Sequence, residues 1–446
     1  MGQAADILIV GLGQTGLSVA RFLARQGQPF AVADSRMDPP GLLELRAELP
    51  QVAVHLGPFD ARLFATFRTL VVSPGIAVAE PAIQAAMQAG AEIIGDIELF
   101  ARHVRAPVIA ITGSNGKSTV TTLVGELLAA AGKRVAVGGN LGTPALDLLD
   151  GEPAEVYVLE LSSFQLETTA SLAPAAAVVL NVSEDHMDRY PSLAAYAEAK
   201  GRIYPKAAVA VVNREDAWSL RLAASAGVTH PVSFGLDAPA PGQWGLLEHD
   251  GQVWLAQGDR PLVRECELTL RGRHNMANAL AALALIEAVG VEPAIVLDAL
   301  RRFAGLPHRS QWVGQFAGLD WINDSKGTNV GATAAALAGQ TAPVVLIAGG
   351  QGKGQDFTAL RPLLAAKARG VVLIGQDADL IEAAWAGVAP IVRAKDMGEA
   401  VERAVELGQP GEVVLLSPAC ASFDMFKGYA HRGEVFAAEV RRRFSA

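Results

Sequence analysis

Cysteine is nearly absent from this sequence. Its 446 residues include two cysteines, Cys266 and Cys420, which lie far apart in the chain and form no disulfide framework. Such sparse cysteine usage suits a reducing cytosol. No uninterrupted apolar stretch reaches the roughly 18 residues that crossing a bilayer requires, and the chain does not open on a basic-then-apolar leader. We therefore expect a soluble cytoplasmic protein without a membrane partner.

Positive charge is not in excess either. The net charge is −9, so we expect no nucleic-acid partner, because such partners are bound largely through neutralisation of phosphates. Short-period repeats and low-complexity segments are absent as well. Hydrophobic residues make up 51% of the chain and charged residues 19%, which indicates a globular protein. A chain of 446 residues is too long for one hydrophobic core, so several domains are expected.

Apolar runs alternate with amphipathic stretches along most of the chain. DILIVG, PFAVAD and TLVVSPG form a first series, APVIAITG, RVAVGG, EVYVLELSS and AAAVVLNVS a second, and LDWINDSK, PVVLIAGG, GVVLIG and EVVLLSPA a third. Alternating strands and helices predict parallel sheets covered on both faces. We expect three consecutive α/β domains, at residues 1–97, 98–305 and 306–446. The stretch 206–270 fits this pattern poorly, and WGLLEHDGQVWLAQG within it is compatible with a hairpin excursion.

The first glycine-rich loop follows the first expected strand. Gly11, Gly13 and Gly16 open a helix, and Asp34 ends the next strand. This pattern is typical of dinucleotide binding: the glycines allow close backbone approach, the helix N-terminus faces a diphosphate, and the acid meets a ribose hydroxyl. A nicotinamide-dependent dehydrogenase is one interpretation, and a βα turn that merely prefers glycine is another. The loop indicates a diphosphate without indicating which nucleotide carries it.

A second glycine-rich loop, TGSNGKST, follows the strand APVIAITG. It is shorter than the common phosphate-binding loop, yet its backbone N–H groups can wrap an anion, Lys117 can neutralise it, and Ser118 or Thr119 can ligate Mg²⁺. Glu160 ends a neighbouring strand, where a metal-binding carboxylate is expected. Residues 181–188, NVSEDHMD, add three acids and a histidine that suit metal coordination. Two nucleotide-type loops favour an ATP-driven synthetase over a simple dehydrogenase.

The motifs resemble those of the Mur ligase family, which builds the peptide of bacterial cell-wall precursors. TGSNGKST, ELSSFQLE, NVSEDHMDRY, RHNMANALAAL, GLPHR and DSKGTN fall in the family's order across nearly the whole chain. GDIELF, GGNLGTP, NDSKGTNV and SPACASFDMFKGYAHRG are similar to its D-glutamate-adding members. The resemblance implies a Rossmann-like first domain, a central domain of the P-loop ATPase type and a Rossmann-like third domain. It also implies ATP-dependent joining of D-glutamate to UDP-N-acetylmuramoyl-L-alanine through an acyl phosphate, by a monomer.

The resemblance further implies a role for individual residues. The residues expected to bind UDP and its sugar are Gln14, Thr15, Asp34, Ser35, Arg36, Ser73, Gly75, Asn140 and Ser162. Those expected to bind ATP are Gly113, Ser114, Asn115, Gly116, Lys117, Ser118, Thr119, Asn278, Arg309 and Asp324. Those expected to bind D-glutamate are Lys326, Thr328, Lys353, Ser422, Phe423 and Tyr429.

Two Mg²⁺ ions and a modified lysine complete the implied site. Ser118 and Glu160 would hold one ion, and His186 would help to hold the other. Lys200 would be carbamylated by CO₂, which turns a cation into an oxygen ligand. Lys117, His186 and Lys200 are thus the candidate catalytic residues. Without the resemblance, Lys200 would be taken for a solvated helix lysine.

Several alternatives stay open at this stage. The chain could add another amino acid, such as a diamino acid or L-alanine, or act as a folylpolyglutamate synthetase; DSKGTN in place of a DNPR-type motif argues against a diamino acid. A nicotinamide oxidoreductase and a non-catalytic ATP-binding scaffold are alternatives of other classes. Phe423, Tyr429 and Gln14 depart from the residues more common in the family, which leaves the shape of their pockets open.

Overall fold

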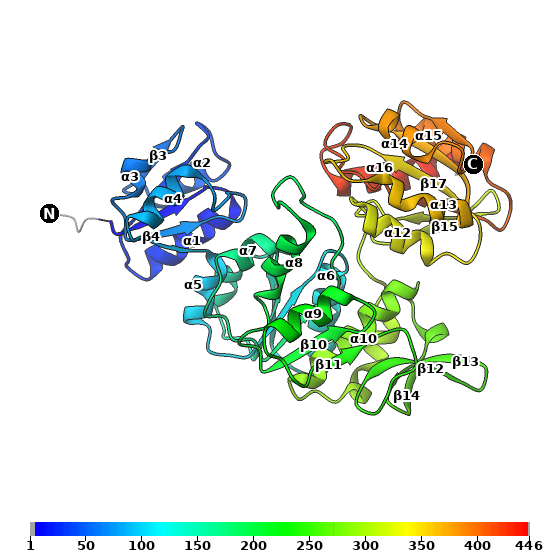
Figure 1. The fold of residues 1–446 in the computed structure, drawn as a ribbon, viewed down its shortest axis with the longest axis horizontal. Coiled ribbons are helices and arrows are strands. Elements are labelled where there is room, and N and C mark those ends of the chain that lie inside the picture. The colour runs from blue at the N-terminus through cyan, green and yellow to red at the C-terminus, as the bar shows by residue number, and fades with distance from the viewer. Residues whose placement is uncertain (1–4, 271, 445–446) are drawn as a thin grey trace.

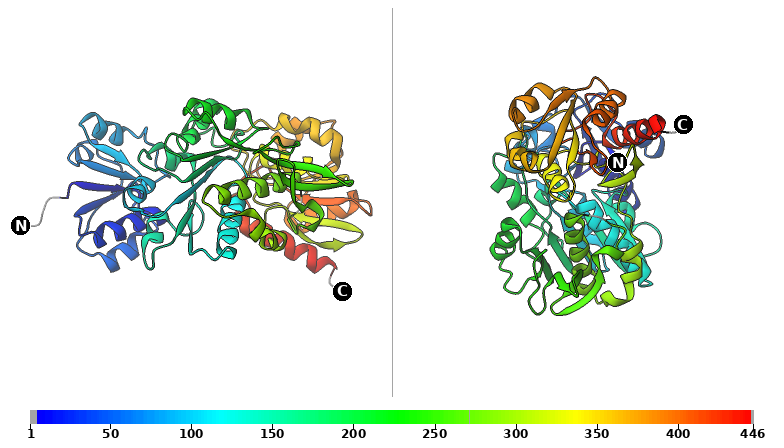
Figure 2. Two further views of the ribbon diagram at one scale, coloured as in Figure 1. Left: turned by 90° about the horizontal axis from the view of Figure 1, so that it is seen from below. Right: turned by 90° about the vertical axis from the view of Figure 1, so that its right-hand side faces the viewer.

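The computed structural model describes residues 5–270 and 272–444. Its strands form three sheets, of five, nine and six strands, and each sheet comes from one continuous part of the chain. Figure 1 shows the three units following one another from blue through green to red, and Figure 2 shows the central unit between the other two. The predicted three-part α/β architecture is confirmed. The domain limits at residues 97 and 305 stay a prediction.

The N-terminal sheet is parallel throughout, with strand order β3-β2-β1-β4-β5. The strands are β1 (Ile7–Val10), β2 (Phe30–Asp34), β3 (Ala53–Leu56), β4 (Thr69–Val72) and β5 (Glu92–Ile94). The helices are α1 (Gln14–Arg25), α2 (Leu42–Glu48), α3 (Ala61–Phe64), α4 (Pro81–Gln88) and α5 (Asp96–His103). Leu8, Ile9 and Val10 of the central strand are fully buried, as expected for a strand covered on both faces. The strand order reverses between β1 and β4, and ligands bind at such a switch point.

The central sheet has the order β14-β13-β12-β11-β10-β9-β6-β8-β7. Its strands are β6 (Val108–Thr112), β7 (Val135–Gly139), β8 (Val156–Glu160), β9 (Ala176–Val179), β10 (Val209–Asn213), β11 (Val232–Phe234), β12 (Trp244–His249), β13 (Gln252–Gln257) and β14 (Arg260–Arg264). Its helices are α6 (Lys117–Ala130), η1 (Ala145–Leu149), α7 (Ser163–Glu167), α8 (Leu193–Gly201), α9 (Ala217–Ser225), η2 (Glu265–Glu267), α10 (Arg273–Ala288), η3 (Pro293–Val296) and α11 (Leu297–Arg302). Strands β12 to β14 are antiparallel neighbours, so the hairpin expected in the poorly legible stretch is confirmed. Its turn lies at Asp250 and Gly251, which both have positive φ.

The C-terminal sheet has the order β15-β16-β20-β17-β18-β19. Its strands are β15 (Gln311–Phe316), β16 (Leu319–Asn323), β17 (Val344–Gly349), β18 (Ala368–Ile374), β19 (Ile391–Arg393) and β20 (Val413–Leu416). Its helices are α12 (Val330–Ala338), η4 (Phe357–Leu360), α13 (Arg361–Lys367), α14 (Ala378–Trp385), α15 (Met397–Leu407) and α16 (Tyr429–Phe444). The sheet is parallel except for β15, which pairs antiparallel with β16. This edge hairpin departs from the fully parallel sheet that strand–helix alternation predicts.

The units are joined in two different ways. One continuous hydrophobic cluster includes Phe22 of α1, Phe100 of α5 and Tyr157 of β8, so the N-terminal and central units share a core. The buried clusters of the C-terminal unit contain residues of that unit alone. Polar contacts tie it to the central unit, among them the hydrogen bond from Arg309 Nη2 to Ser118 Oγ at 2.7 Å.

The structure also bears on membrane-spanning helices and on the two cysteines. Among the helices of the described residues, none is both long and apolar enough to cross a membrane. Cys266 is exposed, Cys420 is buried, and both are free thiols. The prediction that the cysteines form no disulfide framework is therefore confirmed.

Candidate active site

The first glycine-rich loop connects β1 to α1 at the switch point of the N-terminal sheet. A Cβ atom on Gly16 would lie 1.9 Å from the carbonyl oxygen of Gly11, so the helix can approach the strand this closely only with glycine there. The Asp34 carboxylate accepts hydrogen bonds from the Leu12 N–H at 2.7 Å and from the Arg36 side chain at 2.7 and 2.9 Å. Burial opposes ionisation of Asp34, but the Arg36 and Leu12 hydrogen bonds outweigh it and hold its pKa below the usual value. Asp34 thereby fixes both the loop and Arg36.

A cavity of about 540 Å³ opens beside this loop. Seven residues predicted for UDP line it together, and Asn140 of the central unit closes one side. The seven are Gln14, Thr15, Asp34, Ser35, Arg36, Ser73 and Gly75. Ser162 is not among the lining residues; its hydroxyl instead caps α7 by accepting from the Gln165 N–H at 3.2 Å. Gln165 does line the cavity, and the sugar-binding role of Ser162 stays a prediction.

The second glycine-rich loop runs from β6 into α6. Gly116 has φ +85°, and a Cβ atom there would lie 2.6 Å from Asn278 Oδ1, so this position requires glycine on two grounds. The Lys117 ammonium donates to the carbonyl oxygens of Gly113 at 2.7 Å and Ser114 at 2.9 Å. Burial lowers the pKa of Lys117. The lysine thus lies folded onto its own loop, at the place where an anion would be cradled.

Glu160 lies at the end of β8, beside this loop, and is 3% exposed. Its Oε1 accepts a hydrogen bond from Asn140 Nδ2 at 2.7 Å, whereas its Oε2 is buried and has no hydrogen-bond partner. An unpaired buried carboxylate oxygen is costly unless a cation meets it. Within the described residues no group of three or more His, Cys, Asp or Glu side chains gathers as a metal site. One carboxylate supplemented by phosphate oxygens is nevertheless the common way of binding Mg²⁺.

The acidic segment 181–188 faces only in part the central cavity, which the central and C-terminal units line together. Asp185 and His186 line it, whereas Glu184 and Asp188 are exposed to solvent, so the expectation of three acids and a histidine at one metal site is wrong. The tight turn after β9 gives His186 a positive φ of 58° and directs neighbouring side chains apart. The His186 ring packs edge-on against Phe164 at 4.9 Å. Burial lowers its pKa, which keeps the imidazole neutral and able to ligate a metal.

Lys200 of α8 is 1% exposed, although a helix lysine is expected to reach solvent. Its ammonium donates to the Gly113 carbonyl oxygen at 2.9 Å and lies 4.3 Å from the centre of the Tyr196 ring. Burial, with Lys117 nearby, lowers its pKa well below the usual value. No described carboxylate forms an ion pair with it. A buried amine favoured in its neutral form can act as a nucleophile.

The C-terminal unit contributes a loop that follows β16. Asp324 accepts from the Ser310 N–H at 3.0 Å and from Ser417 Oγ at 2.7 Å, and burial raises its pKa to about 6. The Lys326 ammonium lies 4.0 Å from the centre of the Tyr429 ring. Burial, assisted by Arg309 and Lys117, lowers the pKa of Lys326 to about 8. Lys326, Arg309 and Lys117 thus place positive charge between the central and C-terminal units, where an anionic ligand can pair with it.

A central cavity of about 540 Å³ brings residues of both units together. From the central unit, Ser114 to Ser118, Glu160, Asp185 and His186 line it. All six residues predicted for D-glutamate line its other side: Lys326, Thr328, Lys353, Ser422, Phe423 and Tyr429. Phe423 is 70% exposed, whereas Tyr429 is 38% exposed and its ring contacts Lys326 and His308.

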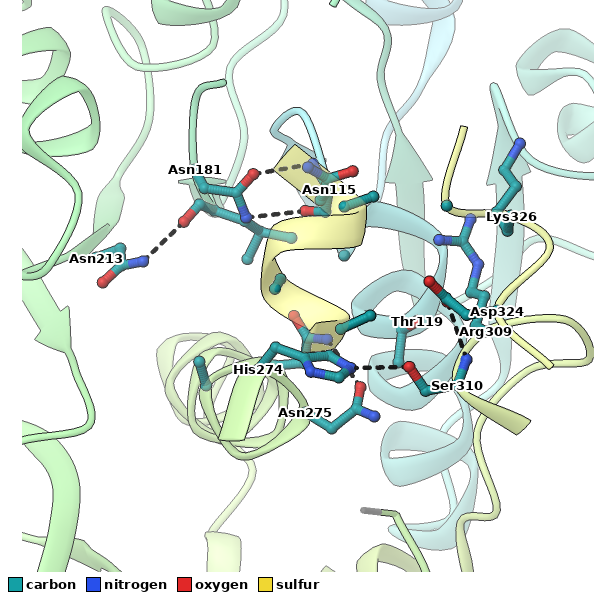
Figure 3. Close-up of a pocket in the computed structure, with 18 of the residues that line it drawn as sticks. Asn115, Thr119, Asn181, Asn213, His274, Asn275, Arg309, Ser310, Asp324 and Lys326 are labelled. Atoms are coloured by element: carbon teal, nitrogen blue, oxygen red, sulfur yellow. Dashed lines mark hydrogen bonds between the residues drawn. The ribbon is translucent and has the colours of Figure 1, made fainter. Parts of the chain in front are cut away.

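A third cavity, of about 240 Å³, lies beyond the second loop and is drawn in Figure 3. Helix α10 supplies His274, Asn275 and Asn278, and apolar walls come from Leu180, Phe234 and Leu236. Asn115, Gly116, Thr119, Arg309 and Asp324 also line it, as predicted for ATP contacts. A cavity with apolar walls that is bordered by amides and adjoins a phosphate loop suits a nucleobase.

The three cavities form one series. Asn140 and Gly142 line both the first and the central cavity. Asn115, Gly116, Arg309 and Lys326 line both the central and the third. The two anion cradles therefore open toward a shared space, in which groups bound at each could meet. Gly113 and Lys200 lie behind the loop, where the Gly113 carbonyl accepts from both lysines.

Sequence reasoning missed several residues of the site. Asn181 and Asn115 exchange two hydrogen bonds, at 2.9 and 3.0 Å, that fix the second loop. Asn329 caps α12 and also donates to Asp185 Oδ2 at 3.3 Å across the two units. The half-buried His274 lies 3.3 Å from Ser310 Oγ (Figure 3). Of these residues, Asn329 could have been recognised from the sequence, since an amide before an apolar helix is a typical N-cap.

Arg432 supports the amino-acid side of the cavity from behind. It is 1% exposed and donates to Ser325 Oγ at 2.9 Å, to the Ser325 carbonyl at 2.7 Å and to the Cys420 carbonyl at 3.1 Å. Burial lowers its pKa to about 10. One buried guanidinium thus joins the loop after β16 to the loop after β20, and both carry cavity-lining residues.

The fold and the site match a known class of enzymes along nearly the whole chain. Residues 5–95 match the Mur ligase MurD-like N-terminal domain, residues 111–286 the Mur ligase middle domain, and residues 308–420 the Mur ligase glutamate ligase domain. The chain belongs to the Mur ligase family.

Individual relatives narrow the comparison. The UDP-N-acetylmuramoylalanine–D-glutamate ligase of Methylobacillus flagellatus is 55% identical over 439 residues, which cover 98% of this chain and 96% of that protein. The enzyme of the same name from Nitrosococcus oceani is 53% identical over 445 residues, covering 99% and 98%. In fold, the chain is similar to MurF ligase from Thermotoga maritima, solved in complex with ADP, with a TM-score of 0.60, 17% identity and coverage of 98% and 96%.

Proposed function

We propose that this protein is an ATP-dependent ligase that joins D-glutamate to UDP-N-acetylmuramoyl-L-alanine in the synthesis of peptidoglycan precursors. The observation that carries the proposal is the series of three connected cavities, with one anion cradle at each end of the central space. A sugar nucleotide fits the first cradle and ATP the second. Relatives named for this reaction are 53% and 55% identical over almost the full chain, which supports the choice of substrates.

The reaction begins with activation of a poor acyl donor. A carboxylate oxygen of the alanine attacks the γ-phosphorus of ATP, the bond to the bridging oxygen breaks, and ADP leaves. Negative charge accumulates on the transferred phosphoryl group, and catalysis is largely positioning and neutralisation of that charge. Lys117 and Arg309 line the central cavity and supply two positive charges. Lys117 exchanges the loop carbonyls for phosphate oxygens when ATP binds.

The second step forms the amide. The neutral amine of D-glutamate attacks the acyl carbon, a tetrahedral intermediate forms, and inorganic phosphate leaves as the amine gives up a proton. Two carboxylates of the amino acid need cations, and Lys326 and Lys353 lie on that side of the cavity. Thr328 and Ser422 add hydroxyl donors there, and the Tyr429 ring lies against Lys326. Holding the amine against the acyl phosphate makes the reaction effectively unimolecular.

The residues present fit Mg²⁺ and a carbamate. The unpartnered Oε2 of Glu160 and the hydroxyl of Ser118 are candidate oxygen ligands beside the loop, and His186 also lines the cavity. Bound Mg²⁺ would neutralise phosphate oxygens. Lys200 is buried with a strongly lowered pKa, and the neutral amine is the form that reacts with CO₂. We propose that this lysine is carbamylated and then presents oxygen atoms to the second ion.

The other assignments follow from the same proposal. UDP is held by Gln14, Thr15, Ser35, Arg36, Ser73 and Gly75. The sugar contacts Asn140 and Ser162, and ATP contacts Asn278 and Asp324.

The domains extend over residues 1–97, 98–305 and 306–446. The protein acts as a cytoplasmic monomer on small molecules, with no nucleic-acid or membrane partner. Light scattering after size exclusion checks the monomer, since a mass of twice 46.5 kDa would contradict it.

The decisive experiment is a phosphate-release assay in which each substrate is omitted in turn. Release is expected only when the sugar nucleotide, ATP and D-glutamate are all present. Equal release without D-glutamate or without the sugar nucleotide would refute the ligase assignment. The Lys117→Ala variant should lose activity, and full activity in that variant would contradict its role with phosphate.

The same assay separates related activities. D-Glutamate should be preferred over L-alanine, L-glutamate and a diamino acid, and preference for any of these would replace the proposed acceptor. A folate acceptor in place of the sugar nucleotide tests folylpolyglutamate synthesis. Fluorescence transfer from the protein to NADH tests for a nicotinamide enzyme. The ligase assignment predicts that no such transfer is detected.

A further inference from the structure

Arg189 reaches across the boundary between the central and N-terminal units. It belongs to the turn that follows β9 in the central unit and is half-buried. Its Nη2 donates a hydrogen bond to the Ile76 carbonyl oxygen at 2.8 Å, and its Nη1 donates to the Pro74 carbonyl oxygen at 3.4 Å. Both acceptors belong to the loop after β4 (the β4 loop, residues 73–76), which lines the cavity beside the first glycine-rich loop.

The β4 loop packs directly against the first glycine-rich loop. The Ser73 hydroxyl donates to the Gly11 carbonyl oxygen at 3.1 Å, and the Ile76 N–H donates to the Ser73 carbonyl oxygen at 2.9 Å, which closes a tight turn. A Cβ atom on Gly11 would lie 2.9 Å from Ile76 Cδ1 and 3.0 Å from Ser73 Cβ, so no space separates the two loops. A shift of the β4 loop therefore changes the shape of the first cradle.

The other side of Arg189 is fixed by the central unit. Its guanidinium carbon lies 4.4 Å from the centre of the Phe164 ring. The same ring packs edge-on against His186 at 4.9 Å and stacks on Tyr190 at 5.8 Å. Figure 1 shows α7, which carries Phe164, on the side of the central unit that faces the N-terminal unit. The Arg189 N–H also donates to the His186 carbonyl oxygen at 2.9 Å, so Arg189 joins the His186 turn to the β4 loop.

The contacts of Arg189 indicate an indirect role. It forms no ion pair with a carboxylate of the described residues. It is not among the residues that line the first or the central cavity, so it does not contact a ligand there. A planar guanidinium can stack on a ring and still direct two donors at two carbonyl oxygens of one loop, whereas the ammonium of a lysine cannot. Any effect of Arg189 on a bound nucleotide therefore passes through the β4 loop.

We propose that Arg189 is a positioning residue for the sugar nucleotide: it links the β4 loop to the turn that carries His186 and so holds the first cradle in its binding shape. The inference rests on the proposed function, because it takes a sugar nucleotide as the ligand of this cradle. A loop that adopts its binding shape for only part of the time binds its ligand more weakly in proportion. Hydrogen bonds from a charged donor are strong enough to change that fraction about tenfold.

The test compares the full-length Arg189→Ala variant with the unaltered protein in the ligation assay. The KM for the sugar nucleotide should rise at least about fivefold, whereas kcat and the KM for D-glutamate should stay within about threefold. Calorimetry with UDP alone should show the same loss of affinity. A merely structural defect would instead reduce the active fraction, which lowers kcat and leaves the KM unchanged. That result, or unchanged UDP affinity, would overturn the proposal.

Two further variants separate the link from an effect of charge or of general stability. Arg189→Lys keeps the charge but loses the paired donors, so it should bind UDP as weakly as Arg189→Ala does; full affinity in the lysine variant would show that charge alone matters. Arg361→Ala is the matched control, because the half-buried Arg361 donates to the carbonyl oxygens of Ala384 at 2.6 Å and Ala386 at 3.2 Å within the C-terminal unit. Its UDP affinity should be unchanged, and an equal loss there would overturn the proposal.

Hydrogen exchange tests the β4 loop directly. Without nucleotide, the backbone amides of residues 73–80 should exchange at least about threefold faster in Arg189→Ala than in the unaltered protein, because the loop opens more often. Ligation by the unaltered protein together with unchanged exchange in the variant would refute this inference alone. If the unaltered protein binds UDP but releases no phosphate with all substrates present, the ligase assignment fails, and the UDP affinities still decide whether Arg189 holds the loop.

Discussion

Replacing Lys200 by methionine should lower the rate of ligation at least about tenfold and yet leave the protein at least as stable as before. Methionine has nearly the length and volume of the lysine stem, so the packing of a side chain that is 1% exposed is retained. Only the charge and its contacts are lost. The rate of ligation is thus expected to fall, while the free energy of unfolding stays the same or rises.

The magnitude follows from the contacts of the ammonium group. Its hydrogen bond to the Gly113 carbonyl contributes about 0.5–1.5 kcal/mol, and its contact with the Tyr196 ring contributes on the order of 2 kcal/mol when desolvated. Against these contacts stands the cost of burying the ammonium, or of removing its proton on burial, which is several kcal/mol. The Gly113 carbonyl keeps its bond from Lys117, so no acceptor is orphaned. The net expectation is a gain of between zero and about 2 kcal/mol.

The gain should depend on pH with a definite sign. Burial, with Lys117 nearby, places the pKa of folded Lys200 well below that of the unfolded chain. Between those two values the unfolded state holds a proton that the folded state lacks, so the stability of the unaltered protein rises with pH. The variant lacks this dependence. Its advantage is therefore largest at low pH and shrinks as the pH rises toward the unfolded pKa.

Urea unfolding in CO₂-free buffer and phosphate release together test this reasoning. Activity should fall at least roughly tenfold, as when a support of a metal site is removed. Lys206→Met is the matched control, because Lys206 is exposed shortly after the same helix and should tolerate the change in both assays. A loss of more than about 2 kcal/mol in Lys200→Met, or activity equal to that of the control, would show that the buried charge is not kept for function.

Other substitutions test single contacts of the site. Gly116→Ala forces a positive φ and a 2.6 Å approach to Asn278 Oδ1, so calorimetry should find ADP binding weakened at least about tenfold, whereas Gly132→Ala, with a positive φ in open space, should leave binding intact. Arg309→Lys loses the planar donor that reaches Ser118 from the C-terminal unit, and kcat should fall at least about tenfold; an unchanged kcat would show that this contact forms only without ATP. Tyr429→Phe keeps the ring face beside Lys326, so the KM for D-glutamate should stay within about twofold, while Tyr429→Leu should raise it about threefold or more, and equal values would exclude a role for the ring.

Local patterns predicted the parts of the site that depend on neighbouring residues in the chain. Each glycine-rich loop follows a buried strand and begins a helix, and Gly16 and Gly116 are required by close approaches that the sequence pattern implies. Glu160 was singled out because a phosphate loop that binds Mg²⁺ needs a carboxylate at the end of a neighbouring strand, and it does end β8, which pairs with β6. The three-part architecture followed from the same alternation.

Contacts between segments that are distant in the chain carry no local signal and could not be predicted from the residues alone. Arg309 and Ser118 are 191 positions apart, and only the docking of two units brings them together. Lys200 is buried by packing around α8, which helix periodicity does not reveal, and the family resemblance alone singled it out. In segment 181–188 the composition suggested a metal cluster, but the turn at His186 leaves Glu184 and Asp188 in solvent. The antiparallel strand β15 was missed because its residues, QWVGQF, contain no apolar run like those of the buried parallel strands.

The shared core of the first two units has a consequence for the order of events. Because one hydrophobic core runs through both, the sites for the sugar nucleotide and the triphosphate are held in a fixed position relative to each other. The third unit contacts these two through polar groups, whose contacts can be exchanged for water at little cost in free energy. An amino acid bound to this more loosely held unit is expected to arrive last, and the unit has to move away again before the product, which the first unit holds by its UDP group, can leave.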